Sequence, residues 1–283
     1  MSRPLSNSEP VESSLTPEEG WHCTHIYYQF ERAVLANMSP ALLDEGAQQL
    51  LVVLDPQGGQ APERIQTSIV SGHKADFGLM LMDPDPLRID AVHQRLLASP
   101  LGPALSSTYS FVSMTEISEY VPSVEQYSQR LVAEGEPEGS PVFQAKVAAY
   151  TKREPMMRRQ RLTPDFPDWR ATCFYPMNKK RATGENWFYL PFEERTALMA
   201  EHAKTGMSFG GKVSQLITVA VGFDDWEWGV TLWARNPEFL KDIVYRMRFD
   251  EASARYAEFG PFYTSYTTTP AEMLQHCRIS DRV

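Results

Sequence analysis

One pattern of secondary structure occurs twice in this chain of 283 residues. Each half contains a strand, a helix, two strands, a helix and a final strand. In the first half these segments lie at 21–30, 40–54, 63–72, 75–83, 85–102 and 108–120. In the second half they lie at 171–178, 190–206, 211–223, 227–235, 236–249 and 259–269. Two split β-α-β units in tandem predict two ferredoxin-like domains.

Helix starts support this reading. Ser39 followed by Pro40 is a standard N-cap and first helical position, and Asn236 followed by Pro237 repeats the arrangement in the second half. An antiparallel sheet with helices on one face needs its other face covered. The simplest cover for each sheet is the other one. The predicted fold class is therefore α+β, with two tandem ferredoxin-like (βαββαβ) domains that form a dimeric α+β barrel.

The predicted domain boundaries follow the composition. Residues 1–20 are rich in Ser, Pro and Glu and are expected to be a disordered N-terminal segment. The first ferredoxin-like domain is expected at 21–122 and the second, ligand-binding one at 169–283. The segment 123–168 shows no strand pattern and is interpreted as a solvated linker or insertion. Its basic cluster of Arg158, Arg159 and Arg161 can still reach the mouth of a pocket.

Charge and composition argue against several classes of protein. The net charge of −9 argues against a nucleic-acid partner, which favours a basic protein face. No apolar run approaches the roughly 18 residues that a membrane span needs, and residues 1–20 lack the apolar core of a secretory signal. Cys23, Cys173 and Cys277 have no metal-ligand spacing and are interpreted as reduced thiols. We therefore expect a cytoplasmic protein.

Candidate functional residues gather between positions 175 and 215. Tyr175, Met177 and Lys179 alternate along one face of a strand. His202 falls on the expected buried stripe of the following helix. Gln215 is a polar residue on an otherwise apolar strand face. This combination is suited to the lining of a pocket for a metal-bearing ligand.

Each of these residues also has a purely structural interpretation. A lone histidine on an apolar helix face is more often a core residue than a ligand, although one histidine is what a haem iron needs from the protein. Tyr175 can be a packed strand tyrosine with its hydroxyl at the rim. Arg248 lies on a face expected to be buried and can pair with Asp250 or Glu251.

The alternative interpretation is that Arg248 binds a carboxylate of the ligand, because the planar guanidinium can hold two oxygens at once. Lys179, Arg161 and Ser253 suit the same role. From the residues alone, the sequence indicates a pocket for an apolar, anionic ligand that can contain a metal.

Five segments resemble the coproheme decarboxylases, the haem-synthesising members of the chlorite dismutase family in Gram-positive-type bacteria and their relatives. They read GHKADFGLMLMDPDP, TYSFVSMTEISEY, CFYPMNKKR, NWFYLPFEERTALMAEH and DDWEWGVTLWARNPEFLKDIVYRMRFDEASARYAEFGPFY. The resemblance covers residues 20–266 and is strongest after Cys173. It implies a dimeric barrel of two ferredoxin-like domains per chain, assembled as a homopentamer, which agrees with the tandem pattern.

The resemblance also implies roles for single residues. His202 resembles the proximal iron ligand, Tyr175 the radical-forming tyrosine and Lys179 the lysine beside it. Gln215 occupies the distal position and Met177 a pocket wall. The residues that resemble contacts of the propionates are Arg161, Arg248, Ser253 and Tyr120.

The implied reaction is the oxidative decarboxylation of Fe-coproporphyrin III (coproheme) by hydrogen peroxide. Two propionates become vinyl groups, and haem b forms through a three-propionate intermediate. A tyrosyl radical at Tyr175 is expected to abstract hydrogen from each reacting propionate. The coproporphyrin ferrochelatase is an expected transient partner.

Two alternatives stay open. Chlorite dismutases share the fold but use a distal arginine where this chain has Gln215, and chlorite chemistry has no use for the Tyr175–Lys179 pair. A haem-binding or haem-carrying protein without turnover would keep the iron ligand and the rim residues but leave Tyr175 idle.

Overall fold

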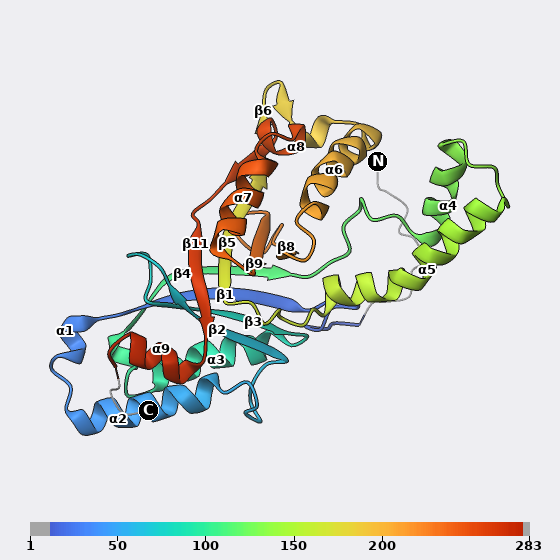
Figure 1. The fold of residues 1–283 in the computed structure, drawn as a ribbon. Coiled ribbons are helices and arrows are strands. Elements are labelled where there is room, and N and C mark those ends of the chain that lie inside the picture. The colour runs from blue at the N-terminus through green and yellow to red at the C-terminus, as the bar shows by residue number, and fades with distance from the viewer. Residues whose placement is uncertain (1–11, 280–283) are drawn as a thin grey trace, which may run out of the picture.

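The computed structural model describes residues 12–279, which form one antiparallel sheet that closes into a barrel (Figure 1). Its strands are β1 (His22–Phe30), β2 (Arg64–Val70), β3 (Phe77–Asp83), β4 (Leu105–Met114), β5 (Ala171–Lys179), β8 (Val213–Val219), β9 (Trp228–Ala234), β10 (Ala257–Phe259) and β11 (Tyr263–Thr268). A separate hairpin contains β6 (Arg181–Ala182) and β7 (Glu185–Asn186). The α-helices are α1 (Arg32–Leu35), α2 (Pro40–Leu54), α3 (Pro86–Ala98), α4 (Val124–Ala133), α5 (Pro141–Leu162), α6 (Phe192–Met207), α7 (Pro237–Met247), α8 (Glu251–Ala254) and α9 (Pro270–His276).

The strand order confirms the tandem prediction. Around the ring, the first half has the order β2-β3-β1-β4 and the second half has the order β8-β9-β5-β11. Corresponding strands take the same places, so this is one ferredoxin-like arrangement twice. The halves join where β2 pairs with β11 and where β4 meets β8, and this closes the ring. The β4–β8 contact is a single pair, Met114 with Val219. Most of the β8 edge facing β4 is therefore unpaired.

The barrel interior is a packed core built from both halves. One cluster inside it contains the aromatic residues Tyr27, Phe111, Phe174 and Tyr263, and another contains Met80, Met82, Leu216 and Trp233. A small cavity of about 20 Å³ lies there beside His25, which is room for about one water molecule. Side chains from both halves therefore fill most of the barrel interior.

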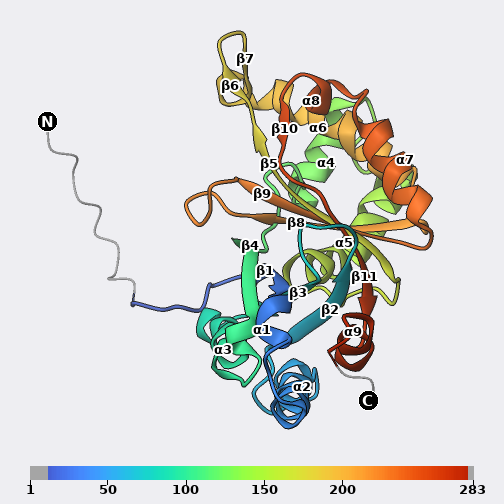
Figure 2. The same ribbon diagram turned by 90° about the vertical axis from the view of Figure 1, so that its left-hand side faces the viewer.

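Helices cover the outside of the barrel, and the two halves differ in how completely they do so. α2, α3 and α9 lie on the outer face of the first half, whereas α6, α7 and α8 lie on the second (Figures 1 and 2). In the first half, Met273 and Leu274 of α9 are fully buried and belong to the same core cluster as α2. Ile65 and Ile69 of β2 pack against that cluster.

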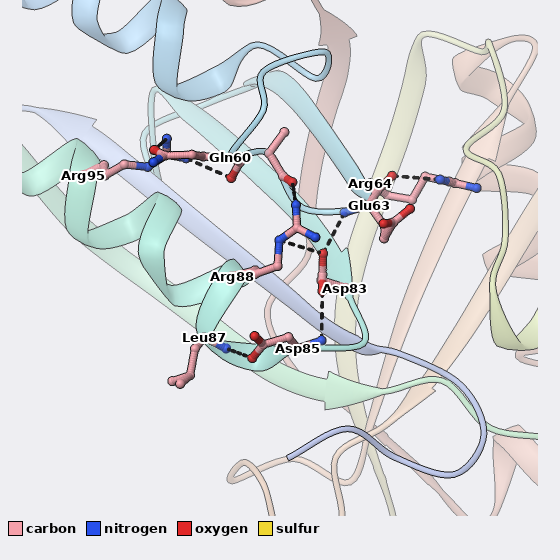
Figure 3. Close-up of polar contacts among 9 residues, drawn as sticks. Gln60, Glu63, Arg64, Asp83, Asp85, Leu87, Arg88 and Arg95 are labelled. Atoms are coloured by element: carbon pink, nitrogen blue, oxygen red, sulfur yellow. Dashed lines mark hydrogen bonds and ion pairs between the residues drawn. The ribbon is translucent and has the colours of Figure 1, made fainter. Parts of the chain in front are cut away.

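The predicted helix starts are confirmed. Ser39 accepts a hydrogen bond from the backbone N–H of Leu42, and Asn236 accepts one from Glu238. The helix start after β3 is fixed by the buried carboxylate of Asp83, which Figure 3 shows between a loop and α3. It accepts hydrogen bonds from the backbone N–H groups of Glu63 and Asp85 at 2.9 and 2.8 Å.

Two regions differ from expectation, and a third is not described. The segment interpreted as a linker contains α4 and the 22-residue α5, a helical hairpin that projects from the barrel (Figure 1). The expected final strand is interrupted at Gly260–Phe262 and forms β10 and β11 on one edge of β5. Of the segment expected to be disordered, residues 1–11 lie outside the described part of the chain.

Candidate functional site

The pairing register places the predicted strand residues on the outer face of the barrel, in its second half. Tyr175 of β5 pairs with Val230 of β9, which pairs with Ile217 of β8. Gln215 lies two residues along β8 from Ile217 and therefore on the same face. Tyr175, Met177 and Gln215 thus share one face of the sheet, as the alternation of the sequence predicts.

Helix α7 covers only part of this face. Leu240, Ile243 and Met247 pack on the β5 and β9 residues around Tyr175. On β8, by contrast, Gln215 is exposed and Ile217 retains 38% of its accessible surface. β2 is the counterpart of β8 in the first half, and there α9 supplies the cover. The described part of the second half has no helix in that position.

Helix α6 runs beside the uncovered strand and is only partly packed. Gly206 is the one buried residue among its 16. Leu198 and Met199 are partly buried against the cluster of Trp187, Ala252 and Tyr256, and this contact holds the helix on the barrel. A ligand between α6 and β8 would cover the inner side of the helix and the exposed residues of β8 together. We call His202 and Gly206 of α6 with Gln215 and Ile217 of β8 the α6–β8 surface.

His202 is half-buried and oriented by a buried carboxylate. Its Nδ1 lies 3.0 Å from Oδ2 of Asp250, whose side chain is 2% exposed. The hydroxyl of Ser253 lies 3.3 Å from the same nitrogen. Asp250 also caps α8 by accepting a 2.9 Å hydrogen bond from the backbone N–H of Ser253. Because the carboxylate occupies Nδ1–H, the lone pair of the imidazole lies on Nε2, which is free to bind a metal.

The electrostatics of Asp250 favour this arrangement. Burial by itself raises the pKa of the carboxyl group, but the hydrogen bonds from His202 and Ser253 outweigh it. The net result is a lowered pKa, so Asp250 carries its negative charge at neutral pH. An ionised partner makes the imidazole a stronger electron donor.

Lys179 lies on the α8 side of the same region. Its ammonium donates a 3.0 Å hydrogen bond to the carbonyl of Ala252 and lies 4.1 Å from the ring centroid of Trp187. Burial lowers the pKa of Lys179 to about 8, while the charge of Asp250 acts in the opposite direction. A lysine with such a pKa can both hold and release a proton near neutral pH.

Tyr175 is buried among aromatic side chains. Its ring stacks on Phe262 with centroids 4.4 Å apart and meets Phe259 edge-on at 5.7 Å. Burial raises the pKa of the phenol above its usual range, although the charge of Arg248 lowers it. The phenol is therefore protonated and lies close enough to Arg248 to be affected by its charge.

Arg248 does not lie where the sequence predicts. It caps the C-terminus of α7 and is exposed, rather than lying on a buried face. It also does not pair with Asp250 or Glu251, because Asp250 binds His202 and Glu251 binds Arg255. Instead, its guanidinium lies 4.5 Å from the centroid of the Phe259 ring. A guanidinium that stacks on a ring keeps its N–H groups available to an anion.

The remaining predicted residues lie around this region at different distances. Met177 packs on the cluster of Tyr175. The hydroxyl of Tyr120 lies 3.1 Å from Nε of Arg195, near the start of α6, so the segment after β4 reaches that helix. Burial raises the pKa of the Tyr120 phenol. Arg161 lies in the last turn of α5 and is exposed.

Gln215 connects β8 with α6. A Cβ added to Gly206 would lie 3.0 Å from Nε2 of Gln215 and 3.2 Å from the terminal methyl group of Met247. The glycine therefore allows α6, β8 and α7 to approach one another. Gly206 is one helical turn from His202 and on the same face of α6, so the Gln215 amide lies near the histidine side of the helix.

Sequence reasoning missed two residues of this region. Asp250 was considered only as a partner for Arg248, although Asp is a preferred N-cap residue and Asp250 caps α8. Trp187, which is 4% exposed and lies under Lys179, was not considered at all. It follows the β6–β7 hairpin, whose two-residue strands are too short to give an alternating pattern.

Residues 12–279 contain neither a cluster of metal ligands nor a membrane-spanning helix. No group of three or more His, Cys, Asp or Glu side chains is placed to hold a metal ion. None of the helices in this range is long and apolar enough to cross a bilayer.

The closed sheet of two ferredoxin-like halves, with one histidine on an outer helix, defines the class as dimeric α+β barrel proteins. The sequence profile described as chlorite dismutase matches residues 44–268. The chain belongs to the chlorite dismutase family.

Individual proteins are similar to this chain along most of its length. A protein of Natronomonas pharaonis, whose name proposes heme binding, is 35% identical over 260 residues, which are 90% of this chain and 40% of that protein. This chain thus spans about two fifths of the length of that relative. A structure described as a novel heme-binding protein from Thermus thermophilus has a TM-score of 0.72 and 32% identity. It covers 92% of this chain and 95% of its own.

Chlorite dismutase from Candidatus Nitrospira defluvii, in a structure with imidazole, has a TM-score of 0.68 at 16% identity. The alignment covers 93% of this chain and 97% of that one. At this identity the likeness concerns the fold alone.

Proposed function

We propose that this protein binds coproheme at the α6–β8 surface and decarboxylates two of its propionates with hydrogen peroxide to give haem b. One observation carries the proposal. An imidazole with its Nδ1 held by a buried, ionised carboxylate lies on a helix that buries a single residue, beside an exposed strand face. The names of the relatives from N. pharaonis and T. thermophilus, which concern heme binding, support the ligand class.

The residues present fit a four-propionate porphyrin. The macrocycle needs an apolar surface, which Ile217 and Met177 supply on the strands and Leu198 and Met199 supply on α6. Its iron needs one axial ligand, and Nε2 of His202 is free for that role. Its carboxylates need donors at the rim, where Arg248 and Lys179 provide cations.

Tyr175 and Lys179 are proposed as the catalytic pair. When bound, the iron supplies the oxidising equivalents that peroxide brings. Tyr175 holds its phenolic hydrogen at neutral pH and is proposed to pass oxidation to the propionate by losing and regaining that hydrogen. Lys179, with a pKa of about 8, is proposed to orient the reacting carboxylate and to move a proton.

Each decarboxylation then consumes one peroxide and one proton. The propionate loses a β-hydrogen, an electron and carbon dioxide, and becomes a vinyl group, while the peroxide becomes two water molecules. Three-propionate porphyrin is the expected intermediate. Ser253, Arg161 and Tyr120 are proposed as further propionate contacts, and Gln215 as the polar residue of β8 that would contact the ligand or a small molecule bound with it.

Anaerobic mixing of the protein with ferric coproheme, followed by peroxide titration and mass analysis, tests the activity. The expected result is two successive mass losses, each of one carboxyl group and one hydrogen. Unchanged porphyrin would favour a carrier without turnover. The names of two relatives, which concern heme binding, are consistent with such a carrier. Because binding is measured before peroxide is added, the experiment distinguishes a carrier from a protein that binds no porphyrin.

Gln215 gives a prediction about the choice within the family. The neutral amide offers less stabilisation to an oxyanion than a guanidinium does. The haem-loaded protein should therefore evolve little or no oxygen from chlorite, as measured with an oxygen electrode. Gln215→Arg is the control that supplies the missing charge. Rapid and sustained oxygen evolution by the unmodified protein would overturn the decarboxylase assignment.

The assembly and partners are also proposed from the family resemblance. We expect a homopentamer, which native mass spectrometry can count, and a transient contact with the coproporphyrin ferrochelatase.

A further inference from the structure

A cleft of about 420 Å³ lies between the end of α5 and the unpaired edge of β8. Residues from both sides line it, including Met156, Gln160 and Asp165 on the α5 side and Gln215, Leu216 and Trp233 on the strand side. His202, Tyr175 and Lys179 are not among them. The cleft is therefore distinct from the surface that holds the catalytic residues, and it meets that surface at Gln215.

The strand edge in the cleft carries free backbone groups. Ala220 donates to the carbonyl of Glu227, and Arg235 donates to that of Lys212. These two bonds identify the even-numbered residues of β8 as those that hydrogen-bond to β9. The backbone N–H and C=O groups of Gln215 and Ile217 consequently point the other way, where β4 pairs only with Val219. The cleft thus offers donors and acceptors for small polar molecules.

Ion pairs hold the opposite wall in place. Asp165 accepts from Arg64 at 2.6 Å and from Arg159 at 2.8 Å, which ties the loop after α5 to β2 and to α5 itself. Pro164 and Pro167 further restrict this loop. The wall is therefore connected to the barrel as well as to α5.

Gln215 joins the cleft to the α6–β8 surface. Its backbone faces the cleft edge, while its amide lies beside Gly206, one turn along α6 from His202. A small molecule in the cleft would therefore meet Gln215 before it reached the residues around His202.

We propose that this cleft is the access route by which small hydrogen-bonding molecules of the peroxide class reach the bound iron on the Gln215 side. The proposal rests on the proposed function, because it assumes porphyrin at the α6–β8 surface. It assigns Gln160 and Met156 to the mouth of the route and separates the oxidant's path from the porphyrin's own binding surface.

Narrowing the cleft with a large side chain tests the route. Gln160→Trp places an indole at the lining, whereas Gln144→Trp makes the same exposed substitution on α5 outside the lining and is the matched control. Each full-length variant is loaded with ferric coproheme without peroxide, and cyanide is the probe. Stopped-flow absorbance gives the cyanide association rate, and a separate titration of unloaded protein gives the coproheme affinity and association rate.

We expect Gln160→Trp to slow cyanide association about tenfold with unchanged coproheme affinity, and Gln144→Trp to change neither. Equal cyanide rates in all three proteins would overturn the route while leaving the proposed function intact. Slower coproheme uptake with normal cyanide association would also overturn it, because the cleft would then admit the porphyrin. Absence of coproheme binding in the unmodified protein would overturn the proposed function and this inference together.

Discussion

Replacement of His202 by alanine is expected to leave coproheme bound, to change its ferric absorption spectrum and to reduce decarboxylation at least about 100-fold. Binding persists because rim contacts are spread over several residues, including Arg248 and Lys179. The spectrum changes because the single axial imidazole is lost. Asp250 then loses a hydrogen-bond partner inside the protein, which costs about 1–3 kcal/mol of folding stability.

The matched control is His93→Ala. His93 also hydrogen-bonds a partner in the core, the hydroxyl of Tyr28 at 2.7 Å, but it lies in the first half of the barrel. Its removal should lower stability without changing the spectrum. Added imidazole should restore the spectrum of the His202 variant and not affect the control. A His202 variant with the original spectrum would make this histidine a structural residue.

The sequence predicted the fold because the repeated pattern constrains it strongly. Two copies of the same element order leave few topologies, and each copy has an apolar strand face that needs a partner. Alternation also placed Tyr175 and Gln215 on one face, as the register later confirmed. These features depend on local periodicity, which a single sequence contains.

Features without local periodicity were missed. The apolar residues of α5 follow no single stripe, and Pro155 lies inside the helix, so its pattern does not resemble that of a buried helix. α9 was not anticipated either, because it follows the repeat and its seven residues are too few for a clear period. Yet α9 covers in the first half the strand face that stays exposed at β8 in the second.

Local periodicity also failed to predict parts of the candidate site. The residue that orients His202 is Asp250, which lies 48 positions further along the chain, and no spacing rule connects the two. Arg248 was placed on a buried face because the helical period was continued one residue past the last turn of α7. Side-chain partners and helix ends are decided by tertiary contacts, so they required the structure.

The substitution Tyr175→Phe is expected to abolish decarboxylation and to leave the fold and coproheme binding nearly unchanged. The phenylalanine ring keeps the stacking on Phe262 and the edge contact with Phe259. Loss of one hydroxyl contact with the ligand costs only about 0.5–1.5 kcal/mol of binding. Without the phenolic O–H, however, no hydrogen can be exchanged with the propionate, so the rate should fall at least about 100-fold.

Tyr109→Phe is the control that separates this effect from a general loss of tyrosine. The Tyr109 hydroxyl is buried inside the barrel without a hydrogen-bond partner among residues 12–279, so its removal should not lower stability. Product analysis after peroxide titration is the measurement for both variants. Peroxide should bleach the porphyrin bound to Tyr175→Phe, whereas Tyr109→Phe should still give the three-propionate intermediate and haem b. Near-normal product from Tyr175→Phe would mean that this tyrosine only packs, and the proposed transfer of hydrogen would have to start from another residue.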